Sequence, residues 1–516
     1  MALLEVILLL MLCAVALGWL ARHFHFPYPI ALVLGGGALG FVPGLPEFPF
    51  DPQLILVLVL PPILYQAALL TSWRDFKANL RPIGLLAIGL VVVTTLGVGW
   101  TVKLLVPELP WAAAFAFGAI VSPPDAVAAT AILSRLSIPR RVVTVLEGES
   151  LVNDASGLVL YKFAVAAVLT GGFSLLDAGV DFTLLSLGGL AVGVALAMLF
   201  VSIHRRLGDA FIEVLMTLSI PYVTYVLAEY LHVSGVLAVV AAGLVRGRYA
   251  PEIVSAEMRI LARSMWNVLT FLLNSLIFIL IGMQLSGIVD RLSGYPVTEL
   301  LGYGLLVSAV AILIRFAWIY PATHLPFLLG EGRVSRPSEP EVFIMSWCGM
   351  RGIVSLAAAL ALPTALPGGE AFPARDLIIF LTFAVIAVTL VMQGLTLGPL
   401  IRRLDVGHDW SHGTEHREAS NALAAAAIEA IDQLAQREAI PAELAARVRA
   451  EFVEKATVEM HEDHAPGEDF GPAKRLRLAA IQAERQALLR IWRENRIGDE
   501  VLHQLEEKLD YQEQLT

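Results

Sequence analysis

The sequence carries little charge for its length. Of its 516 residues, 16% are Asp, Glu, Lys or Arg, whereas 57% are apolar. A soluble domain carries about 25% charged residues, and the mean hydropathy here is positive, at +0.72. This composition excludes a water-soluble enzyme and predicts an integral membrane protein.

Cysteine is scarce, and an excess of positive charge is missing. The two cysteines, Cys13 and Cys348, lie in apolar segments, so no disulfide framework is expected. The net charge of −10 offers no basic surface for nucleic acid. Ser150 lies in no Gly-x-Ser-x-Gly turn and has no histidine near it in a span, so we expect no enzyme activity. Nothing in the sequence indicates a bound cofactor.

The charge that is present is concentrated towards the C-terminus. Half of the acidic residues, 23 of 46, follow Ile401. We therefore expect a transmembrane domain over residues 1–404 and a cytoplasmic tail over residues 405–516. The tail is rich in Ala, Glu, Arg and Gln with amphipathic spacing, which predicts a helical module. We expect this module to regulate activity or to assist dimerisation.

The apolar part divides into thirteen candidate helices. A helix needs about 20 apolar residues to cross the hydrocarbon core. Breaks at charges, prolines and glycine clusters give the segments 2–21, 28–44, 53–70, 82–106, 110–134, 140–171, 183–203, 212–231, 234–247, 262–287, 298–329, 341–365 and 376–401. We predict an all-α polytopic membrane protein with about thirteen spans. The weak boundary between the eighth and ninth segments leaves twelve or fourteen open.

Lysine and arginine predict the orientation of these spans. Positive residues collect on the cytoplasmic side. With thirteen spans, one set of loops carries Arg22, Arg74, Lys77, Arg81, Arg135, Arg140, Arg141, Arg205, Arg206, Arg246, Arg248, Arg259, Arg263, Arg333, Arg336, Arg402 and Arg403. The other set holds only Lys103, Arg291 and Arg375. The N-terminus is therefore expected outside and the tail inside, in the plasma (inner) membrane.

The fifth span contains an acid beside two prolines. Asp125 follows Ser122, Pro123 and Pro124, and proline removes a backbone donor and obstructs the preceding turn. Broken backbone at membrane depth is tolerated where it is buried or lines a cavity. A helix opened here would expose carbonyls and Asp125 to an ion. A proline kink with Asp125 as a satisfied helix cap is the alternative.

The sixth span places four polar residues on one broad helix face. Glu149 and Asn153 are four residues apart, as are Ser150 and Asp154, which brings each pair onto neighbouring turns. Carboxylate, hydroxyl and amide oxygens suit a hard cation that sheds its water. A structural polar network would use the same residue types and stays open as an alternative. Ionisable groups at this depth are functional candidates by default.

Two arginines supply positive charge within later spans. Arg315 lies in the eleventh span and Arg351 in the twelfth, where glycines on both sides weaken the helix. Arginine stays charged, so each one needs a buried acid or backbone carbonyls. Glu149 and Asp125 are the available acids.

The order of the spans indicates a transporter. Spans 1–6 and 8–13 form two sets of six, and the interrupted helices are the fifth member of each set. A shift of seven spans reverses the direction of crossing, so the two sets are predicted to be inverted repeats. Paired interrupted spans in inverted halves are typical of a secondary transporter with its site at the membrane midplane.

Several motifs resemble the sodium/proton exchangers of the monovalent cation:proton antiporter family, in particular its bacterial members. The segment Gly148–Asp154 resembles the family signature, Leu60–Tyr65 a third-span motif and Asp125–Ala128 the broken fifth span. The segments Ala228–Leu237 and Gly349–Gly352 are also similar. The resemblance covers most of the first 400 residues.

The resemblance implies a role for each matching residue. Asp154 would bind sodium or a proton in turn, with the Ser150 hydroxyl near the ion and Asp125 approaching from the helix break. Asn153 would belong to the ion-binding residues and would mark the electroneutral branch of the family. The structural charges would be Glu149, paired with Arg315 and steadying Asn153, and Arg351 at the crossing. One departure is that Pro124 precedes Asp125 and Ala126 follows it, which leaves a backbone ligand at this point unassigned.

The expected function is one-for-one exchange of Na+ or Li+ for H+ by alternating access. Either occupant neutralises Asp154, whereas the bare carboxylate crosses between facings only at high cost. Two alternatives stay open: a K+/H+ antiporter of the same fold, and a membrane sensor or channel that signals through its tail. We expect a homodimer in the lipid bilayer.

Overall fold

Helices are the main secondary structure in the part of the chain that the computed structural model describes. It describes residues 2–24, 27–42, 52–125, 138–172, 175–254, 256–292, 294–328, 337–404, 425–437 and 441–450, with the single positions 129, 133, 406, 484, 486, 490, 494 and 511. Within these ranges the only β pairing is an isolated bridge between Ala365 and Ala371. The chain forms two compact units, Met1–His408 and Asp409–Thr516.

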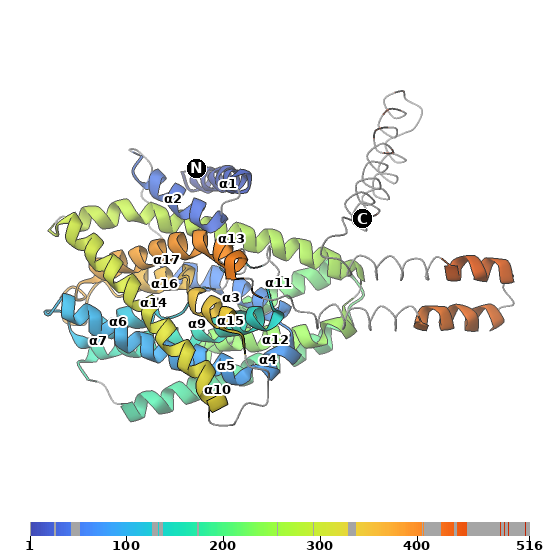
Figure 1. Ribbon diagram of the computed structural model, residues 1–516, viewed down its shortest axis with the longest axis horizontal. Helices are drawn as coiled ribbons and strands as arrows, with labels where there is room; N and C mark the ends of the chain where they lie inside the picture. The colour runs from blue at the N-terminus through green and yellow to red at the C-terminus, as the bar shows by residue number, and fades with distance from the viewer. Residues whose placement is uncertain are drawn as a thin grey trace. The chain divides into compact units, whose positions relative to one another are not determined.

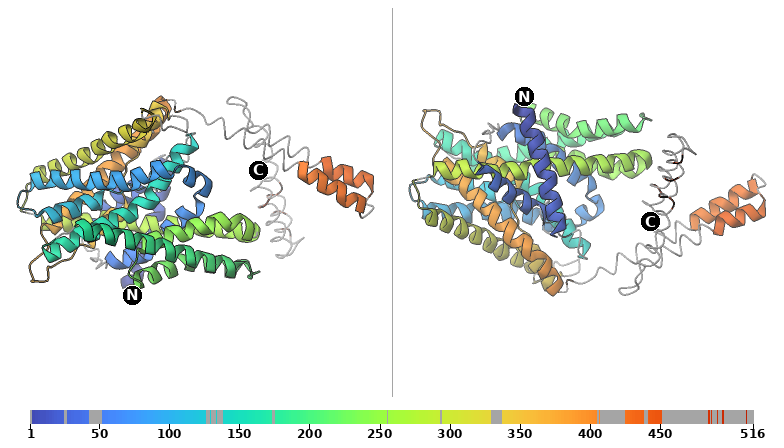
Figure 2. Two further views of the ribbon diagram at one scale, coloured as in Figure 1. Left: turned by 90° about the horizontal axis from the view of Figure 1, so that it is seen from below. Right: turned by 90° about the horizontal axis from the view of Figure 1, so that it is seen from above.

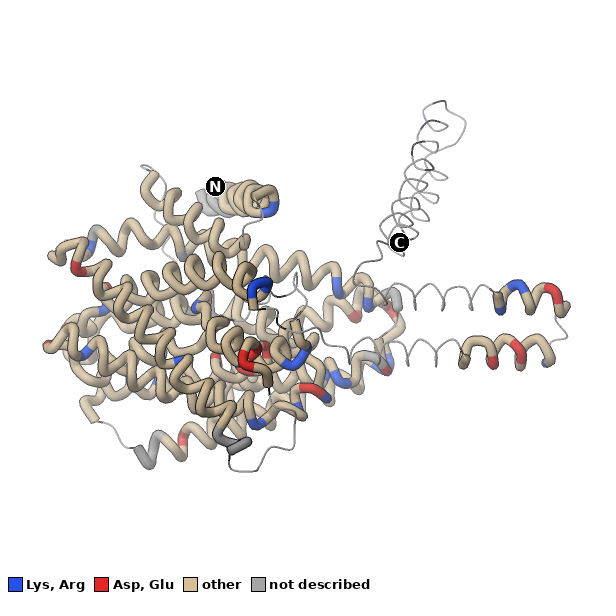
Figure 3. The backbone as a smooth tube through the Cα atoms, viewed as in Figure 1, with Lys and Arg blue, Asp and Glu red and all other residues tan. Residues whose placement is uncertain are grey.

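Among the residues of the first unit that the structure describes, seven helical segments are long and apolar enough to cross a membrane. They are Leu80–Leu105, Arg140–Thr170, Gly179–His204, Ala210–Tyr230, Met258–Val289, Val297–His324 and Arg375–Leu404. A helix satisfies its own backbone hydrogen bonds, which is what a span in lipid requires. Figure 2 shows the helices of this unit running alongside one another, and Figure 3 shows few charged positions within them.

The elements of the first unit follow the predicted segments in order. Their bounds are α1 Ala2–His23, α2 Tyr28–Gly40, α3 Pro52–Leu70, α4 Trp73–Ala78, α5 Leu80–Gly84, η1 Leu85–Leu90, α6 Val91–Leu105, α7 Trp111–Val121, α9 Arg140–Thr170, α10 Leu175–His204, α11 Ala210–Tyr230, α12 Gly235–Ile253, α13 Ala256–Arg291, α14 Val297–Leu328, α15 Glu339–Trp347, α16 Ile353–Leu360 and α17 Arg375–Leu404. Each of the thirteen segments overlaps one helix or a group of consecutive short helices. In the fifth segment, 110–134, only Trp111–Val121 form a helix of several turns in the described part, and most residues after Asp125 lie outside it. The number of membrane crossings stays a prediction.

Two helices are interrupted, at the predicted places. α7 ends at Val121, and residues Ser122–Asp125 are not helical. α15 ends at Trp347 and α16 begins at Ile353, so five residues between them leave the helix. The residues Ala126, Val127 and Ala128, which the sequence assigns to the same motif as Asp125, lie outside the described part.

The packing of the helices follows the inverted repeat. With the shift of seven spans, α2 corresponds to α12 and α3 to α13. In the structure α2 packs along α13, and α12 packs along α3, so the two pairs are equivalent. Figure 1 shows α2 lying against α13.

Glycines explain how closely these two pairs approach. A Cβ atom on Gly36 of α2 would collide with the backbone of Ile279 in α13. A Cβ atom on Gly243 of α12 would lie 2.9 Å from the carbonyl oxygen of Tyr65 in α3. Each glycine is followed four residues later by another, Gly40 or Gly247. Both pairs thus use the small-residue spacing that lets membrane helices touch.

A cluster of buried polar residues joins α10, α11 and α12. His204 Nδ1 lies 3.1 Å from Arg246, and His204 Nε2 lies 3.2 Å from the carboxylate of Glu213. The Arg246 guanidinium is 2% exposed. Arg246 was predicted to be a loop residue. This prediction is wrong, because Arg246 lies within α12, which continues to Ile253, and its side chain is buried against His204.

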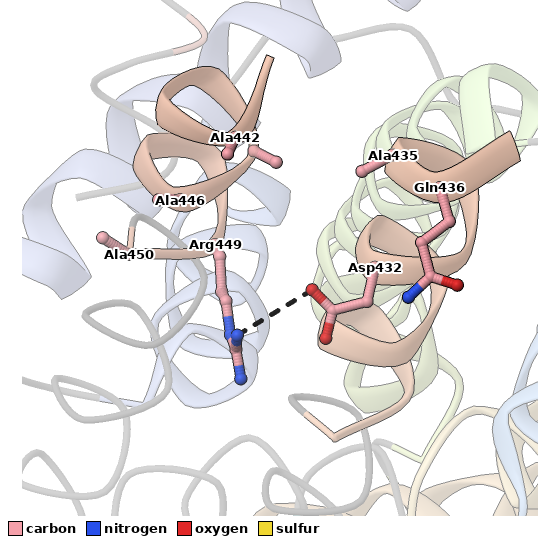
Figure 4. Close-up of a pocket in the computed structure, with 8 residues that line it drawn as sticks. Asp432, Ala435, Gln436, Ala442, Ala446, Arg449 and Ala450 are labelled. Carbon is pink, nitrogen blue, oxygen red and sulfur yellow. Dashed lines mark ion pairs between the residues drawn. The ribbon is translucent and has the colours of Figure 1, made fainter. Parts of the chain in front are cut away.

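The second unit contains a helical hairpin in its described part. Residues 425–437 and 442–450 are helical, and Pro441 begins the second helix by accepting the backbone N–H of Leu444 at 3.0 Å. Arg449 pairs with Asp432 at 3.8 Å, beside a cavity of 610 Å³ lined largely by alanines (Figure 4). Most of the predicted tail lies outside the described residues.

Candidate functional site

The two helix breaks meet each other. The backbone N–H of Asp125, after α7, donates to the carbonyl oxygen of Met350, between α15 and α16, at 2.7 Å. Gly352 lies against Asp125 so closely that a Cβ atom at this position would overlap its carboxylate. Extended segments from the two halves of the chain therefore cross at one point, and glycine at position 352 is required for this approach.

Arg351 stabilises the crossing through carbonyl groups. Its side chain is 1% exposed. Its Nε donates to the carbonyl oxygen of Val121 at 2.9 Å, and its Nη1 donates to that of Gly349. The C-terminal end of a helix carries partial negative charge, so Arg351 compensates the exposed end of α7. Of the two partners that the sequence left open, a buried acid or backbone carbonyls, the recorded hydrogen bonds are to carbonyls.

The polar face of α9 lies beside the first break. Asn153 is fully buried and Asp154 is 6% exposed. The side chains of Ser150 and Asn153 both donate to the carbonyl oxygen of Pro124, at 3.5 and 3.4 Å. The break at these prolines thus leaves a carbonyl group exposed, and two side chains of α9 donate hydrogen bonds to it. Among the described residues, the amide of Asn153 contacts this carbonyl rather than Glu149, and its Oδ1 has no hydrogen-bond partner.

Glu149 and Arg315 form a buried ion pair behind this face. The two guanidinium nitrogens donate to the two carboxylate oxygens at 2.5 and 2.8 Å. Both side chains are at most 1% exposed. Arg315 also donates to the carbonyl oxygen of Met345 at 3.2 and 3.1 Å. The pair therefore joins α9, α14 and the end of α15, and charge-assisted bidentate bonds of this kind fix the geometry.

A cavity of 580 Å³ brings the candidate ion-binding residues together. Asp125, Ser150 and Asp154 line it, whereas Asn153 is not among its lining residues. Further polar side chains come from five helices, α2, α3, α9, α13 and α16. These additional polar residues are Tyr28, Gln66, Glu147, Asn267, Thr270, Asn274 and Ser355. Asn274 Oδ1 and Ser355 Oγ are buried without a partner among the described residues. Buried polar atoms are normally satisfied, so these oxygens suit a cavity that holds water or a cation.

The donor set is chemically specific. The lining residues offer three carboxylates, those of Asp125, Glu147 and Asp154, together with hydroxyl and amide oxygens, and they include no His or Cys. Within the described ranges no group of three His, Cys, Asp or Glu residues could hold a metal ion. Oxygen ligands without such a cage suit a hard cation that binds and leaves. Na+ in such a site is cargo.

Several cavity residues were missed by the sequence reasoning. Asn267, Thr270 and Asn274 are spaced by three and four residues, so they share one face of α13. That spacing inside an apolar span was a usable signal. Glu147 stands seven residues before Asp154 and shares its face in the same way. The Pro124 carbonyl could not have been found, because its direction depends on how the two breaks meet.

This arrangement defines a class of protein. A bundle of apolar helices built from two inverted halves, with crossed interrupted helices and an acid at the crossing, is the architecture of secondary transporters. Residues 7–403 match the family described as sodium/hydrogen exchanger, transmembrane. The chain belongs to this family. It is an integral membrane protein and a secondary active transporter that exchanges Na+ for H+.

Relatives extend over nearly the whole chain. It is 34% identical to an uncharacterized Na+/H+ exchanger of Mycobacterium tuberculosis, over 98% of this chain and 95% of the relative. It is 32% identical to a sodium, potassium, lithium and rubidium/H+ antiporter of Bacillus subtilis, over 98% of this chain and 77% of the relative. The fold is similar to that of the sodium proton antiporter MjNhaP1 of Methanocaldococcus jannaschii, with a TM-score of 0.63 and 21% identity over 78% of this chain and 99% of that one.

Proposed function

We propose that Asp154 is the residue that carries the exchange, by holding a cation and a proton in turn. The observation that supports this role is its position: a 6% exposed carboxylate that lines the cavity beside the crossing of the two breaks. Ser150 and Asp125 line the same cavity and would complete the oxygen ligands of the cation. Asn153 would position the Pro124 carbonyl rather than bind the ion itself.

The exchange is proposed to be electroneutral and one-for-one. Na+ and H+ each neutralise Asp154, and the neutral site can change its facing. Moving the bare carboxylate through low dielectric is costly, so an empty site does not return. The Glu149–Arg315 pair and the carbonyl contacts of Arg351 support constant charge at these residues throughout the cycle.

Li+ and K+ are proposed as further substrates. The ligands are oxygens alone, which do not strictly fix the size of a monovalent cation. The Bacillus subtilis relative is named for four alkali cations, which supports a broad selectivity. Exchange of K+ as the main cation is therefore the second candidate function. The sensor or channel alternative predicts no stoichiometric counter-transport.

The setting of the protein is proposed from the sequence. The distribution of arginine and lysine supports an N-terminus outside and a cytoplasmic tail. We propose a homodimer in the plasma membrane that needs no cofactor, with the tail as a regulatory module that adjusts exchange to pH.

The test is exchange in proteoliposomes with Asp154→Asn. We expect the variant to fold and insert but to lose Na+-driven proton movement to the level of empty vesicles, with Li+ and K+ as parallel arms. Wild-type exchange should not change with a membrane potential imposed on the same vesicles. Normal exchange by the variant would end the assignment of Asp154, and a rate that scales with potential would contradict the one-for-one stoichiometry.

A further inference from the structure

Glu147 is an acidic residue of the cavity to which the exchange cycle above gives no role. It lies on α9 seven residues before Asp154 and lines the same cavity. With a rise of 1.5 Å per residue, seven residues separate the two positions by about 10.5 Å along the helix axis. Glu147 is the nearer of the two to Arg140, where α9 begins.

Glu147 and its neighbour Glu149 differ in whether the carboxylate is paired with a cation. Glu149 is neutralised by both nitrogens of Arg315. The contacts recorded over the described ranges include no ion pair for Glu147, and its side chain is half-buried at the cavity wall. Arg140, at the same end of α9, pairs with Asp75 at 3.2 Å. Glu147 therefore presents an uncompensated negative charge to the cavity.

A cavity with walls of low dielectric constant focuses the field of such a charge and raises the local concentration of cations. The cavity reaches from Asp154 past Glu147 to Leu70 and Asn267, near the ends of α3 and α13 that the proposed orientation places in the cytoplasm. A cation that enters from this end passes Glu147 before it reaches Asp154.

We propose that Glu147 is an entrance carboxylate, which attracts monovalent cations from the cytoplasm and sets the apparent affinity of the inward-facing site. It acts on the cation before the change of facing and does not travel with it. This inference rests on the proposed function, because it takes Asp154 as the destination of the ion.

The test is the kinetics of Glu147→Gln in everted vesicles, which present the cytoplasmic face. At about 10.5 Å and an effective dielectric constant of 20 to 80, loss of one charge predicts a rise in KM for Na+ of roughly 2- to 15-fold. The maximal rate should stay unchanged. The measurement belongs at alkaline pH, where protons compete least, and the effect should shrink as choline chloride is added, because salt screens the charge.

Restoring the charge elsewhere separates electrostatics from structure. Asn267 lines the same cavity from α13, so Asn267→Asp should lower KM in the wild type and return it towards normal in Glu147→Gln. Glu370→Gln, at an exposed position outside the cavity, is the matched control and should change nothing.

Two results would overturn the inference: an unchanged KM in Glu147→Gln, or a fall in maximal rate that Asn267→Asp does not reverse. Should Glu147→Gln fail to insert, the Asn267→Asp variant alone decides, because an unchanged KM there contradicts the electrostatic role. Either failure leaves the proposed function standing as long as Asp154→Asn abolishes exchange. Exchange that persists in Asp154→Asn refutes the proposed function instead.

Discussion

At the scale of single residues, the Glu149–Arg315 pair shows why charge is retained inside an apolar bundle. Burying either charge alone costs several kcal/mol, and the pair offsets this cost only with good geometry and further hydrogen bonds. Both conditions hold here, because the contact is bidentate and Arg315 also binds the Met345 carbonyl. The pair is therefore a joint between α9, α14 and α15 whose two halves depend on each other.

We expect Glu149→Gln to destabilise the protein by about 3–5 kcal/mol, because Arg315 is left charged without its partner. Thermal unfolding of the purified variant in detergent, read by tryptophan fluorescence, measures this loss. The double variant Glu149→Leu with Arg315→Met removes both charges and should recover most of the stability. A single variant as stable as the wild type, or a double variant no better than the single, would contradict this account.

The residues of the candidate site could largely be read from helical spacing. Glu149, Ser150, Asn153 and Asp154 share a face because α9 is regular, and the structure places three of them against the cavity or the break. What could not be read is which carbonyls turn towards them. The Pro124 carbonyl can accept from α9 because α7 ends at Val121 and leaves this carbonyl outside the helix, and its direction follows from the meeting of breaks about 225 residues apart.

At the scale of elements, hydropathy placed the helices well and their ends less well. The prediction ended the ninth segment at residue 247, whereas α12 continues to Ile253. The charged residues Arg246 and Arg248 mark the end of the apolar segment, although the helix continues past both. A buried arginine that contacts His204 leaves no trace in the local sequence, because its partner comes from another helix.

The inverted repeat could be recognised from the order and direction of the spans, but not from the identities of their residues. The corresponding helices α2 and α12 share few residues at equivalent positions apart from their glycines, Gly36 and Gly40 in one and Gly243 and Gly247 in the other. Four-residue spacing of glycine is common in membrane helices, so the shared glycines alone do not show that α2 and α12 are equivalent. Their partner helices must be equivalent as well. This condition holds, because α2 packs against α13 and α12 packs against α3, and α3 corresponds to α13.

We expect Gly36→Ala and Gly243→Ala each to lower stability by about 1–3 kcal/mol, because the added methyl group must push two helix backbones apart. Thermal unfolding in detergent measures the loss. Gly84→Ala is the matched control, since a Cβ atom there meets nothing within 4 Å, and alanine favours a helix over glycine. Equal stability of all three variants would show that the close contacts are not needed.

At the scale of the whole membrane unit, the cavity and two ion pairs lie at opposite ends of the helices. We define the core as α6, α7, α9 and α14–α17, which hold the site, and the scaffold as α2, α3 and α10–α13. Near the end of the bundle away from Glu147, Lys162 of the core lies 3.6 Å from Glu229 of the scaffold, and Asp376 of the core lies 3.1 Å from Arg291 of the scaffold. With the proposed orientation, in which the end that holds the cavity is cytoplasmic, this arrangement corresponds to an inward-facing state.

In the proposed alternating-access cycle, rocking of the core against the scaffold separates these two ion pairs, because the same end has to open when the site faces outward. Exposed ion pairs are worth about 0–1 kcal/mol each, so they break easily, whereas a covalent link does not. We therefore expect exchange to fall at least tenfold when Lys162→Cys with Glu229→Cys, or Arg291→Cys with Asp376→Cys, is joined by a short bis(methanethiosulfonate), which forms a reducible disulfide with each cysteine and releases methanesulfinate. The background carries Cys13→Ser and Cys348→Ala, and each single-cysteine variant treated in the same way is the control.

Reduction should restore the rate, because the link stops the motion and leaves the site intact. Full exchange in a quantitatively linked protein would mean that core and scaffold do not part at these pairs, and the outer path would then have to open elsewhere.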